Sequence, residues 1–159
     1  MPASNPIKTP VAVEEEQPDN SMLELQWVVN ALLPIRRQRL SRAERHWRET
    51  GRRLQQTEVS LHQQQARLTQ MKTDWQQQRA IFLRDALGKT QTLESLKNQL
   101  EQEQKQIRQI QAQVLLCTDW QQQYLYWQQQ ASEAREAVRL CQKAVEKLEF
   151  LLTTYQEAI

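Results

Sequence analysis

One apolar column runs through the first half of this chain and restricts what it can fold into. It recurs every seven residues without a gap, at Leu33, Leu40, Trp47, Leu54, Leu61, Leu68, Trp75 and Phe82. A seven-residue repeat keeps one stripe of a helix against a partner helix, and its mismatch with the helical period winds the two into a left-handed supercoil. The column therefore predicts a long coiled-coil helix over residues 34–87.

The composition is typical of a coiled coil and not of a globular enzyme. Apolar residues make up 39% of the chain and aromatic residues 6%, enough for a seam between helices but not for a compact core. The sequence contains no phosphate-binding loop and no paired nucleophile and base, and His46 and His62 lie too far apart on one helix to share a metal ion. We expect no enzymatic activity, no cofactor, no metal site and no small-molecule substrate.

Two segments are expected ahead of this helix. Residues 1–20 combine four prolines with a run of three glutamates, a composition that predicts a disordered tail. Ser21 and Glu24 have the spacing of a capping box, which predicts that a helix starts there. Pro34 then predicts a break or a kink, so that residues 21–33 form either a short separate helix or an extension of the long one.

Gly88 ends the first apolar column and predicts a reversal of the chain, with a turn over residues 88–90 and a second arm over 91–159. The seam of this second arm is expected at Leu93, Leu96, Leu100, Ile107, Ile110 and Val114. A tip at Gly88 would place Leu68 opposite Ile107. The spacing slips between Val114 and Trp120, which predicts a locally overwound stretch.

The expected fold is thus all-α: an antiparallel two-helix coiled-coil hairpin with a short N-terminal helix and a disordered N-terminal tail. A second column of the first arm is weak, because it reads Thr50, Thr57, Gln64, Met71 and Gln78. Since only one column of this arm is rich in apolar residues, we expect a slender hairpin with surface left over for another protein.

Eight arginines gather at the start of the first arm, among only two acids: Arg36, Arg37, Arg39, Arg42, Arg45, Arg48, Arg52 and Arg53. A basic stretch that leads into leucines at heptad spacing resembles a basic leucine-zipper DNA reader. Against that alternative, the apolar column continues through the basic stretch at Leu40 and Trp47, whereas a DNA-contacting helix diverges from its partner. A protein-facing basic surface, a solvated face and a nucleic-acid site all stay open, and we favour the first.

Cys117 and Cys141 would lie too far apart along one helix to form a disulfide, which is typical of a reduced cytoplasmic protein. The sequence shows no secretion signal and no apolar run long enough to span a membrane. We therefore expect a cytoplasmic location and no membrane span.

The stretch LLPIRRQRLSRAE at residues 32–44 resembles the opening of the central-stalk proteins of type III secretion systems, the YscO type, with the flagellar FliJ proteins as more distant relatives. Arg39, Arg42, Ala43 and Glu44 match the basic and R-x-x-R-A-E-like part of that opening. The later stretch LCQKAVEKLEFL, at residues 140–151, resembles the distal helix of the family. The acidic, proline-containing start of this chain is not part of the family pattern.

The resemblance implies a non-enzymatic stalk that inserts in the hexameric export ATPase, faces the export gate protein and also binds secretion chaperones. It implies a location on the cytoplasmic side, peripheral to the membrane-embedded apparatus. On this hypothesis the arginines supply basic contacts, and Trp27, Leu32 and Leu33 belong to the paired-terminus end that enters the ATPase. Two alternatives remain, a DNA-binding zipper dimer and a general coiled-coil scaffold or adaptor.

Overall fold

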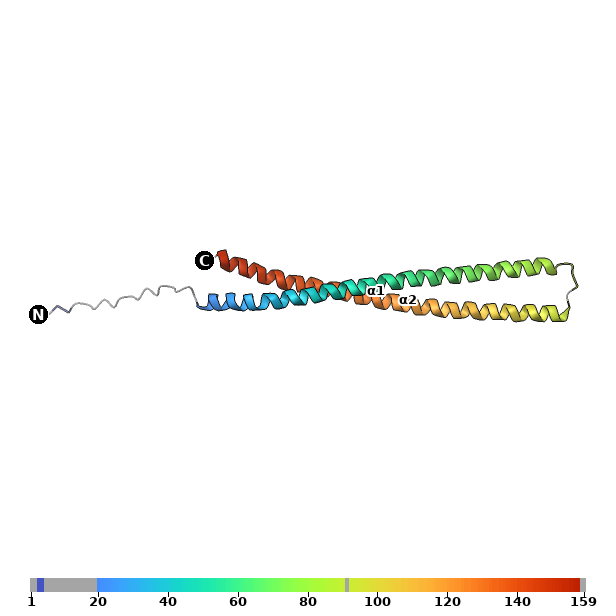
Figure 1. Ribbon diagram of the computed structural model, residues 1–159, viewed down its shortest axis with the longest axis horizontal. Coiled ribbons are helices and arrows are strands. Elements are labelled where there is room, and N and C mark those ends of the chain that lie inside the picture. The colour runs from blue at the N-terminus through green and yellow to red at the C-terminus, as the bar shows by residue number, and fades with distance from the viewer. Residues whose placement is uncertain (1–2, 5–19, 91, 158–159) are drawn as a thin grey trace. The chain divides into compact units, whose positions relative to one another are not determined.

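Two long helices account for most of the described part of the chain in this computed structural model (Figure 1). The structure describes residues 3–4, 20–90 and 92–157. Helix α1 spans Asn20–Ala86 and helix α2 spans Leu93–Glu157, and no strand occurs within those ranges. Cross-helix contacts pair Gln64 with Gln113 and Gln78 with Gln106, so the helices pack antiparallel. The all-α, two-helix hairpin predicted from the sequence is confirmed, whereas the predicted tail at residues 1–20 lies almost entirely outside the described residues.

Helix α1 runs through Pro34 without a break. Residues 21–33 are therefore an extension of the long helix, and the separate short helix offered as the other possibility is wrong. The helix begins at Asn20, one residue before the predicted start at Ser21. Proline removes one backbone donor and crowds the preceding turn, and the packing of Val29 and Leu33 against α2 on that same stretch offsets this cost.

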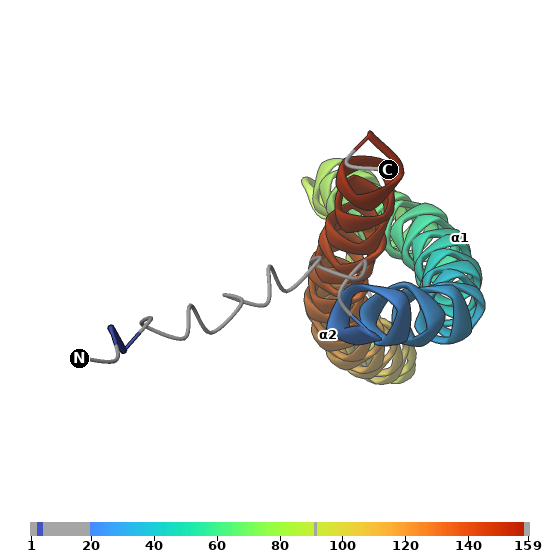
Figure 2. The same ribbon diagram turned by 90° about the vertical axis from the view of Figure 1, so that its left-hand side faces the viewer.

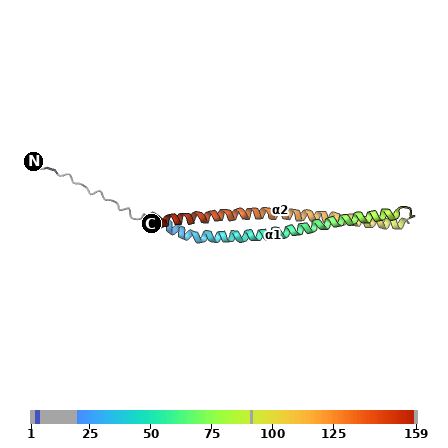
Figure 3. The ribbon, with the colours of Figure 1, turned by 90° about the horizontal axis from the view of Figure 1, so that it is seen from above.

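The predicted turn at Gly88 is confirmed (Figure 3). Gly88 has a φ of 84°, the left-handed conformation that a helix needs just after its end and that glycine adopts without strain. The amide of Lys89 donates to the carbonyl of Ala86 at 3.4 Å. Thr92 caps the second helix, because its Oγ1 accepts from the amide of Ser95 at 3.2 Å. The second arm therefore begins at Leu93 rather than at residue 91.

The two glycines give opposite predictions for stability. A Cβ placed on Gly51, inside α1, meets no atom within 4 Å, so Gly51→Ala is expected to raise the free energy of unfolding by about 1 kcal/mol. Gly88→Ala is expected to lower it by about 1 kcal/mol, because an L-residue is strained at positive φ. Thermal unfolding followed by far-UV circular dichroism measures both shifts. Shifts of the same sign for the two variants would contradict these roles.

The chain divides into two compact units. The terminal unit contains the described parts of Met1–Ser41 and Leu140–Ile159, and the central unit contains those of Arg42–Arg139. In the terminal unit Val29 and Leu33 of α1 form a buried cluster with Val145 and Leu148 of α2, and Leu40 and Leu152 pack against it. In the central unit the buried apolar residues are Leu61, Ala134 and Val138. Each unit thus has a thin core made by one face of each helix.

The predicted apolar column of α1 faces α2 over most of its length. Leu33 and Leu61 are buried, and the half-buried members are Leu40, Leu54, Leu68, Trp75 and Phe82. Trp47 is the exception, because 41% of its surface is exposed.

Most of the weak second column also lies in the interface, although it contains few apolar residues. Thr50 is 2% exposed and Thr57 is likewise buried. Their hydroxyls donate to the carbonyls of Trp47 at 2.9 Å and of Arg53 at 2.7 Å, which satisfies them within the helix and lets small polar side chains fill a buried position.

The seam of α2 differs from the predicted one. Its buried and half-buried residues near the turn follow one another by four and three without a slip, at Gln99, Glu103, Gln106, Ile110, Gln113 and Cys117. Ile110 is the predicted seam residue that lies among them. The other predicted members are exposed and the prediction is wrong for them: Leu93, Leu96, Leu100, Ile107 and Val114. Two related predictions are therefore also wrong: the pairing of Leu68 with Ile107 and the slip in spacing near Val114.

Two features explain why polar residues of α2 face α1 near the turn: the spacing of the seam further along α2 and the glutamines that α1 presents. Trp120, Tyr124 and Trp127 continue the same spacing beyond Cys117. An undistorted helix that turns these residues toward α1 therefore also turns Gln99, Gln106 and Gln113 toward it. Bringing Leu100 and Ile107 inward would require local overwinding. Helix α1 also presents glutamines at this level, and Gln113 Nε2 donates to Gln64 Oε1 at 2.8 Å and to the Gln64 carbonyl at 3.0 Å.

Candidate functional site

The eight predicted arginines divide between the two units, and only some of them have ion-pair partners among the described residues. In the terminal unit, Arg36 is half-buried and its Nη1 donates to the carbonyl of Ala144 at 3.1 Å. Arg37 pairs with Glu149 at 3.1 Å, with both side chains about half exposed. Both arginines therefore join α1 to α2. An exposed ion pair of this kind stabilises a fold by at most about 1 kcal/mol, so the contact matters mainly for alignment.

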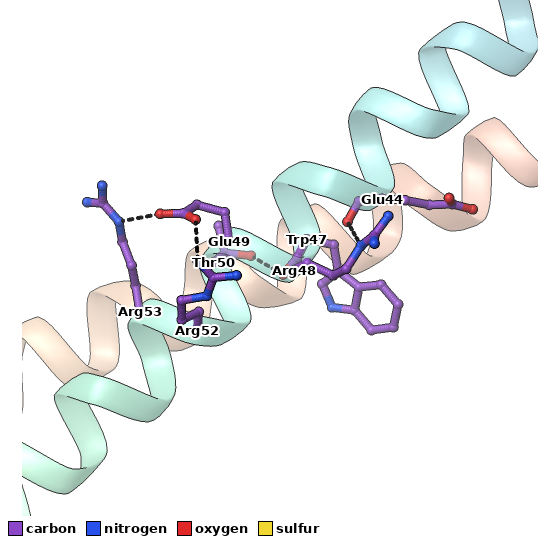
Figure 4. A network of polar contacts seen from close by, with 7 residues as sticks. All are labelled: Glu44, Trp47, Arg48, Glu49, Thr50, Arg52 and Arg53. Carbon is purple, nitrogen blue, oxygen red and sulfur yellow. Dashed lines mark hydrogen bonds and ion pairs between the residues drawn. The ribbon is translucent and has the colours of Figure 1, made fainter.

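The arginines at the start of the central unit fall into two groups, and Figure 4 shows three of them, Arg48, Arg52 and Arg53. Glu49 accepts from Arg53 at 3.2 Å and lies 3.9 Å from Arg52, within one stretch of α1. The guanidinium of Arg53 also lies 4.9 Å from the ring centroid of Trp127, a cation–π contact across the helices. Arg52 and Arg53 are thus held by neighbouring side chains.

Arg42, Arg45 and Arg48 keep their charge available, and we call them the unpaired arginine group. All three are exposed, and none has a carboxylate oxygen within 4 Å among the residues that the structure describes. Arg48 Nε donates only to the backbone carbonyl of Glu44, at 3.4 Å (Figure 4). Arg39, in the terminal unit, is likewise exposed and without an ion pair to any described residue.

The arrangement of this segment does not fit a DNA-reading helix. Thr50 is buried against α2 in the middle of the basic stretch, so one face of α1 is covered there. A basic leucine zipper needs two parallel helices that diverge over the DNA, whereas α1 pairs with an antiparallel helix of its own chain.

The start of α1 and the end of α2 belong to the terminal unit, and Figure 2 views the helices from the side of these two ends. Of the three residues predicted for this paired-terminus end, Trp27 and Leu32 are exposed, Trp27 by 73%. Leu33 is 6% exposed and belongs to the core, so its prediction as a partner-binding residue is wrong. The distinction follows from helical spacing, because Val29 and Leu33 lie four apart on the face toward α2, whereas Leu32 and Trp27 lie on other faces.

Sequence reasoning missed Phe150 and the groove beside it. Phe150 is 71% exposed and lines an open groove of about 690 Å³ in the terminal unit. The other lining residues are Arg36, Leu140, Lys143, Ala144, Glu146 and Lys147. The groove combines apolar walls with three cations and one carboxylate, so its chemistry favours an acidic segment with apolar side chains. A signal existed, since Leu140 and Phe150 lie outside the seam spacing of α2.

The described thiols and imidazoles lie on the two long helices. Cys117 and Cys141 are half-buried free thiols, and His62 Nε2 lies 3.7 Å from Glu58 within one turn of helix. Within the described ranges no three histidine, cysteine or acidic side chains come together as metal ligands. Neither α1 nor α2, as far as the structure describes them, contains an apolar stretch able to cross a membrane.

Residues 32–44 and 140–151, the two segments on which the predicted family relationship depends, lie partly against one another. Arg36 and Arg37, from the first segment, contact Ala144 and Glu149, from the second, within the terminal unit. Comparisons of the chain with protein-family models, with curated proteins and with solved structures find no match.

Proposed function

We propose that this chain is a non-enzymatic central stalk of a type III secretion export apparatus. In this function the hairpin inserts in the hexameric export ATPase, regulates its hydrolysis and links it to the export gate protein. The location would be the cytoplasmic side of the membrane that holds the apparatus. The sequence resemblance at residues 32–44 and 140–151 suggests this family, and the two-helix hairpin is the fold that such a stalk requires.

One observation supports the proposal most. The paired-terminus end exposes large apolar side chains from both helices, chiefly Trp27 and Leu32 of α1 and Phe150 of α2. Exposed aromatic residues of this size are the usual anchors of protein interfaces, where a few of them contribute most of the binding free energy. An end built from two helices can therefore enter a ring of subunits and be held by apolar contacts.

A stalk of this kind can regulate a six-fold ring because it has no six-fold symmetry. It touches the subunits unequally, and it shifts a subunit between open and closed states only by the difference in its contacts with the two. The unpaired arginine group would add contacts to acidic loops of the ring or the gate. Mutating such rim charges is expected to change the association rate and its salt dependence more than the final affinity.

The test is hydrolysis and binding by the purified export ATPase, with and without the full chain. We expect the chain to stimulate hydrolysis, and we expect the double variant Trp27→Ala with Phe150→Ala to bind at least about tenfold more weakly, since truncating interface anchors costs more than 1 kcal/mol each. The matched control is Val59→Ala, which removes an exposed apolar side chain from the central unit and should change neither readout.

Failure of the unmodified chain to bind the ATPase would overturn the stalk proposal and leave a scaffold or adaptor as the function of the hairpin. Equal weakening by Val59→Ala and by the double variant would also count against it, because the paired-terminus end would then have no special role. Circular dichroism of each variant verifies that the helices are intact before binding is compared.

A further inference from the structure

An apolar column on α2, next to the turn, is left uncovered by the hairpin. Leu93, Leu100, Ile107 and Val114 recur every seven residues and are 85%, 59%, 38% and 40% exposed. We call these four residues the distal stripe. They lie in the central unit, adjacent to the seam residues Glu103 and Ile110 on the helix surface. The stripe is therefore the side of α2 that borders the interface with α1 without entering it.

Single exposed leucines need no explanation, since much of any protein surface is apolar. The distal stripe is different because its members repeat with the spacing that a packed helix requires. The seam beside it consists of glutamines, Glu103 and Ile110, whereas the other aliphatic residues of the same stretch lie outside. A heptad column of aliphatic side chains is the pattern that accepts the apolar face of another helix.

The charges around the distal stripe indicate what kind of helix would fit. Lys97 lies on α2 one turn from both Leu93 and Leu100, and it has no ion pair with any described residue. On α1, Arg79 reaches across to Glu103 at 3.9 Å, which places this side of α1 beside the stripe. Lys72 lies two turns before Arg79 on the same face and is exposed without an ion pair to the described part of the chain.

Because Glu103 already pairs with Arg79, Lys97 on α2 and Lys72 on α1 are the unpaired charges that flank the stripe most closely. Glu94, Glu101 and Arg108 each follow a stripe residue by one position, so they lie about 100° round α2 on the side away from α1. A helix with acidic residues beside its apolar face would complement the two lysines. A second copy of this chain would instead bring the same lysine-bordered stripe against itself, and like charges across an interface oppose association. The charge pattern thus favours a different partner over self-association.

We propose that the distal stripe is the docking site for an amphipathic helix of a partner protein, with apolar residues at heptad spacing and acidic residues on both sides of them. The partner helix packs on Leu93, Leu100, Ile107 and Val114 as a third helix of the coiled coil. Its carboxylates pair with Lys72 and Lys97. This site goes beyond the stalk function, because it uses none of the residues at the paired-terminus end.

The test uses the full chain and two synthetic helical peptides of 21 residues, each with leucine at every a and d position. One peptide has glutamate at the e and g positions and the other has lysine there. We expect the acidic peptide to bind, with fluorescence anisotropy as the readout, and the lysine peptide to bind at least about tenfold more weakly at low salt.

Variants of the chain locate the binding site. Leu100→Glu and Ile107→Glu should each weaken the acidic peptide at least about tenfold, because each places a charge in the centre of the stripe. Leu125→Glu is the matched control, since Leu125 is an exposed leucine of α2 outside the stripe and its substitution should leave binding unchanged. All three positions are exposed, so circular dichroism should show unaltered helix content.

Absence of binding by the acidic peptide would overturn the proposal. Equal binding of both peptides, or loss of binding in Leu125→Glu to the same extent as in Leu100→Glu, would overturn it as well. Light scattering that shows a dimer of the unmodified chain, lost in Ile107→Glu, would replace the partner helix by a second copy. None of these results bears on stimulation of the export ATPase, which is measured with unmodified stripe residues.

Discussion

Leu33→Ala is expected to lower the free energy of unfolding by about 2–3 kcal/mol, the lower part of the range for truncating a core leucine. Leu33 is 6% exposed and belongs to the cluster with Val29, Val145 and Leu148 in the terminal unit. Truncating the side chain loses the free energy gained by burying it, and it also leaves a gap between the two helices. The cluster is one layer thick, so part of that gap can close, and the effect should be smaller than in a globular core. Urea unfolding followed by far-UV circular dichroism measures it.

The neighbouring residue supplies the control. Leu32 has the same side chain and the same helical environment, but it is 36% exposed and is not part of the cluster. Leu32→Ala should therefore change the free energy of unfolding by less than about 0.5 kcal/mol, as surface substitutions usually do. A loss in Leu32→Ala as large as in Leu33→Ala would mean that α1 is rotated relative to the face described above.

The second large effect is expected from replacing a polar layer of the seam. Gln113 is 6% exposed, and its amide donates to the side chain and the carbonyl of Gln64. Changing both residues to leucine removes the two carboxamides together, so neither side-chain amide is left without its partner, and it adds buried apolar surface. We expect Gln64→Leu with Gln113→Leu to raise the free energy of unfolding by about 2 kcal/mol.

The single variant Gln113→Ala separates the effect of losing the hydrogen bond from the effect of adding buried apolar surface. Gln113→Ala removes the donor and leaves the Gln64 carboxamide without it, which should lower the free energy of unfolding by about 1 kcal/mol. A polar layer in a coiled coil also selects one register at a cost in stability, so the double leucine variant should form oligomers more readily. Destabilisation of the double variant would show that this pair does not lie between the helices.

Much of the hairpin can be predicted from sequence because two of its signals are local. The heptad column from Leu33 to Phe82 specifies which face of α1 is buried, and Gly88 is the residue that can adopt positive φ at the end of that helix without strain. Pro34 locally favours a break or a kink, yet α1 continues through it without a break, because tertiary packing of Val29 and Leu33 offsets the local preference of proline. Local signals therefore predict the two arms and the turn more reliably than they predict whether a proline breaks a helix.

The phase of α2 could not be predicted from its apolar residues alone. Leu93, Leu100, Ile107 and Val114 form a better apolar column than Gln99, Gln106 and Gln113, yet the glutamines face α1. The choice depends on the phase carried over from Trp120 and Trp127 and on the polar residues that α1 presents. Both are properties of the pair of helices, so a pattern read along one helix does not contain them.

The candidate sites were predicted in part. The arginines are surface residues in most cases, but the sequence does not reveal which of them are held by Glu49 or Glu149 and which remain unpaired. Trp27 and Leu32 are exposed as the paired-terminus prediction requires, whereas Leu33, the next residue, is buried. Position around the helix decides between these outcomes, and it is known only once the partner face is known.

The most direct test concerns the pairing of the two arms in the central unit. Two double-cysteine variants are compared in a background where Cys117 and Cys141 are changed to serine: Gln64→Cys with Gln113→Cys, and Leu68→Cys with Ile107→Cys. The structure predicts rapid linkage within the monomer for the first pair by a short bifunctional thiol reagent, because these residues are in contact across the helices. Preferential linkage of the second pair would show that the leucine column faces α1, and linkage only between chains would show that the helices do not form a hairpin.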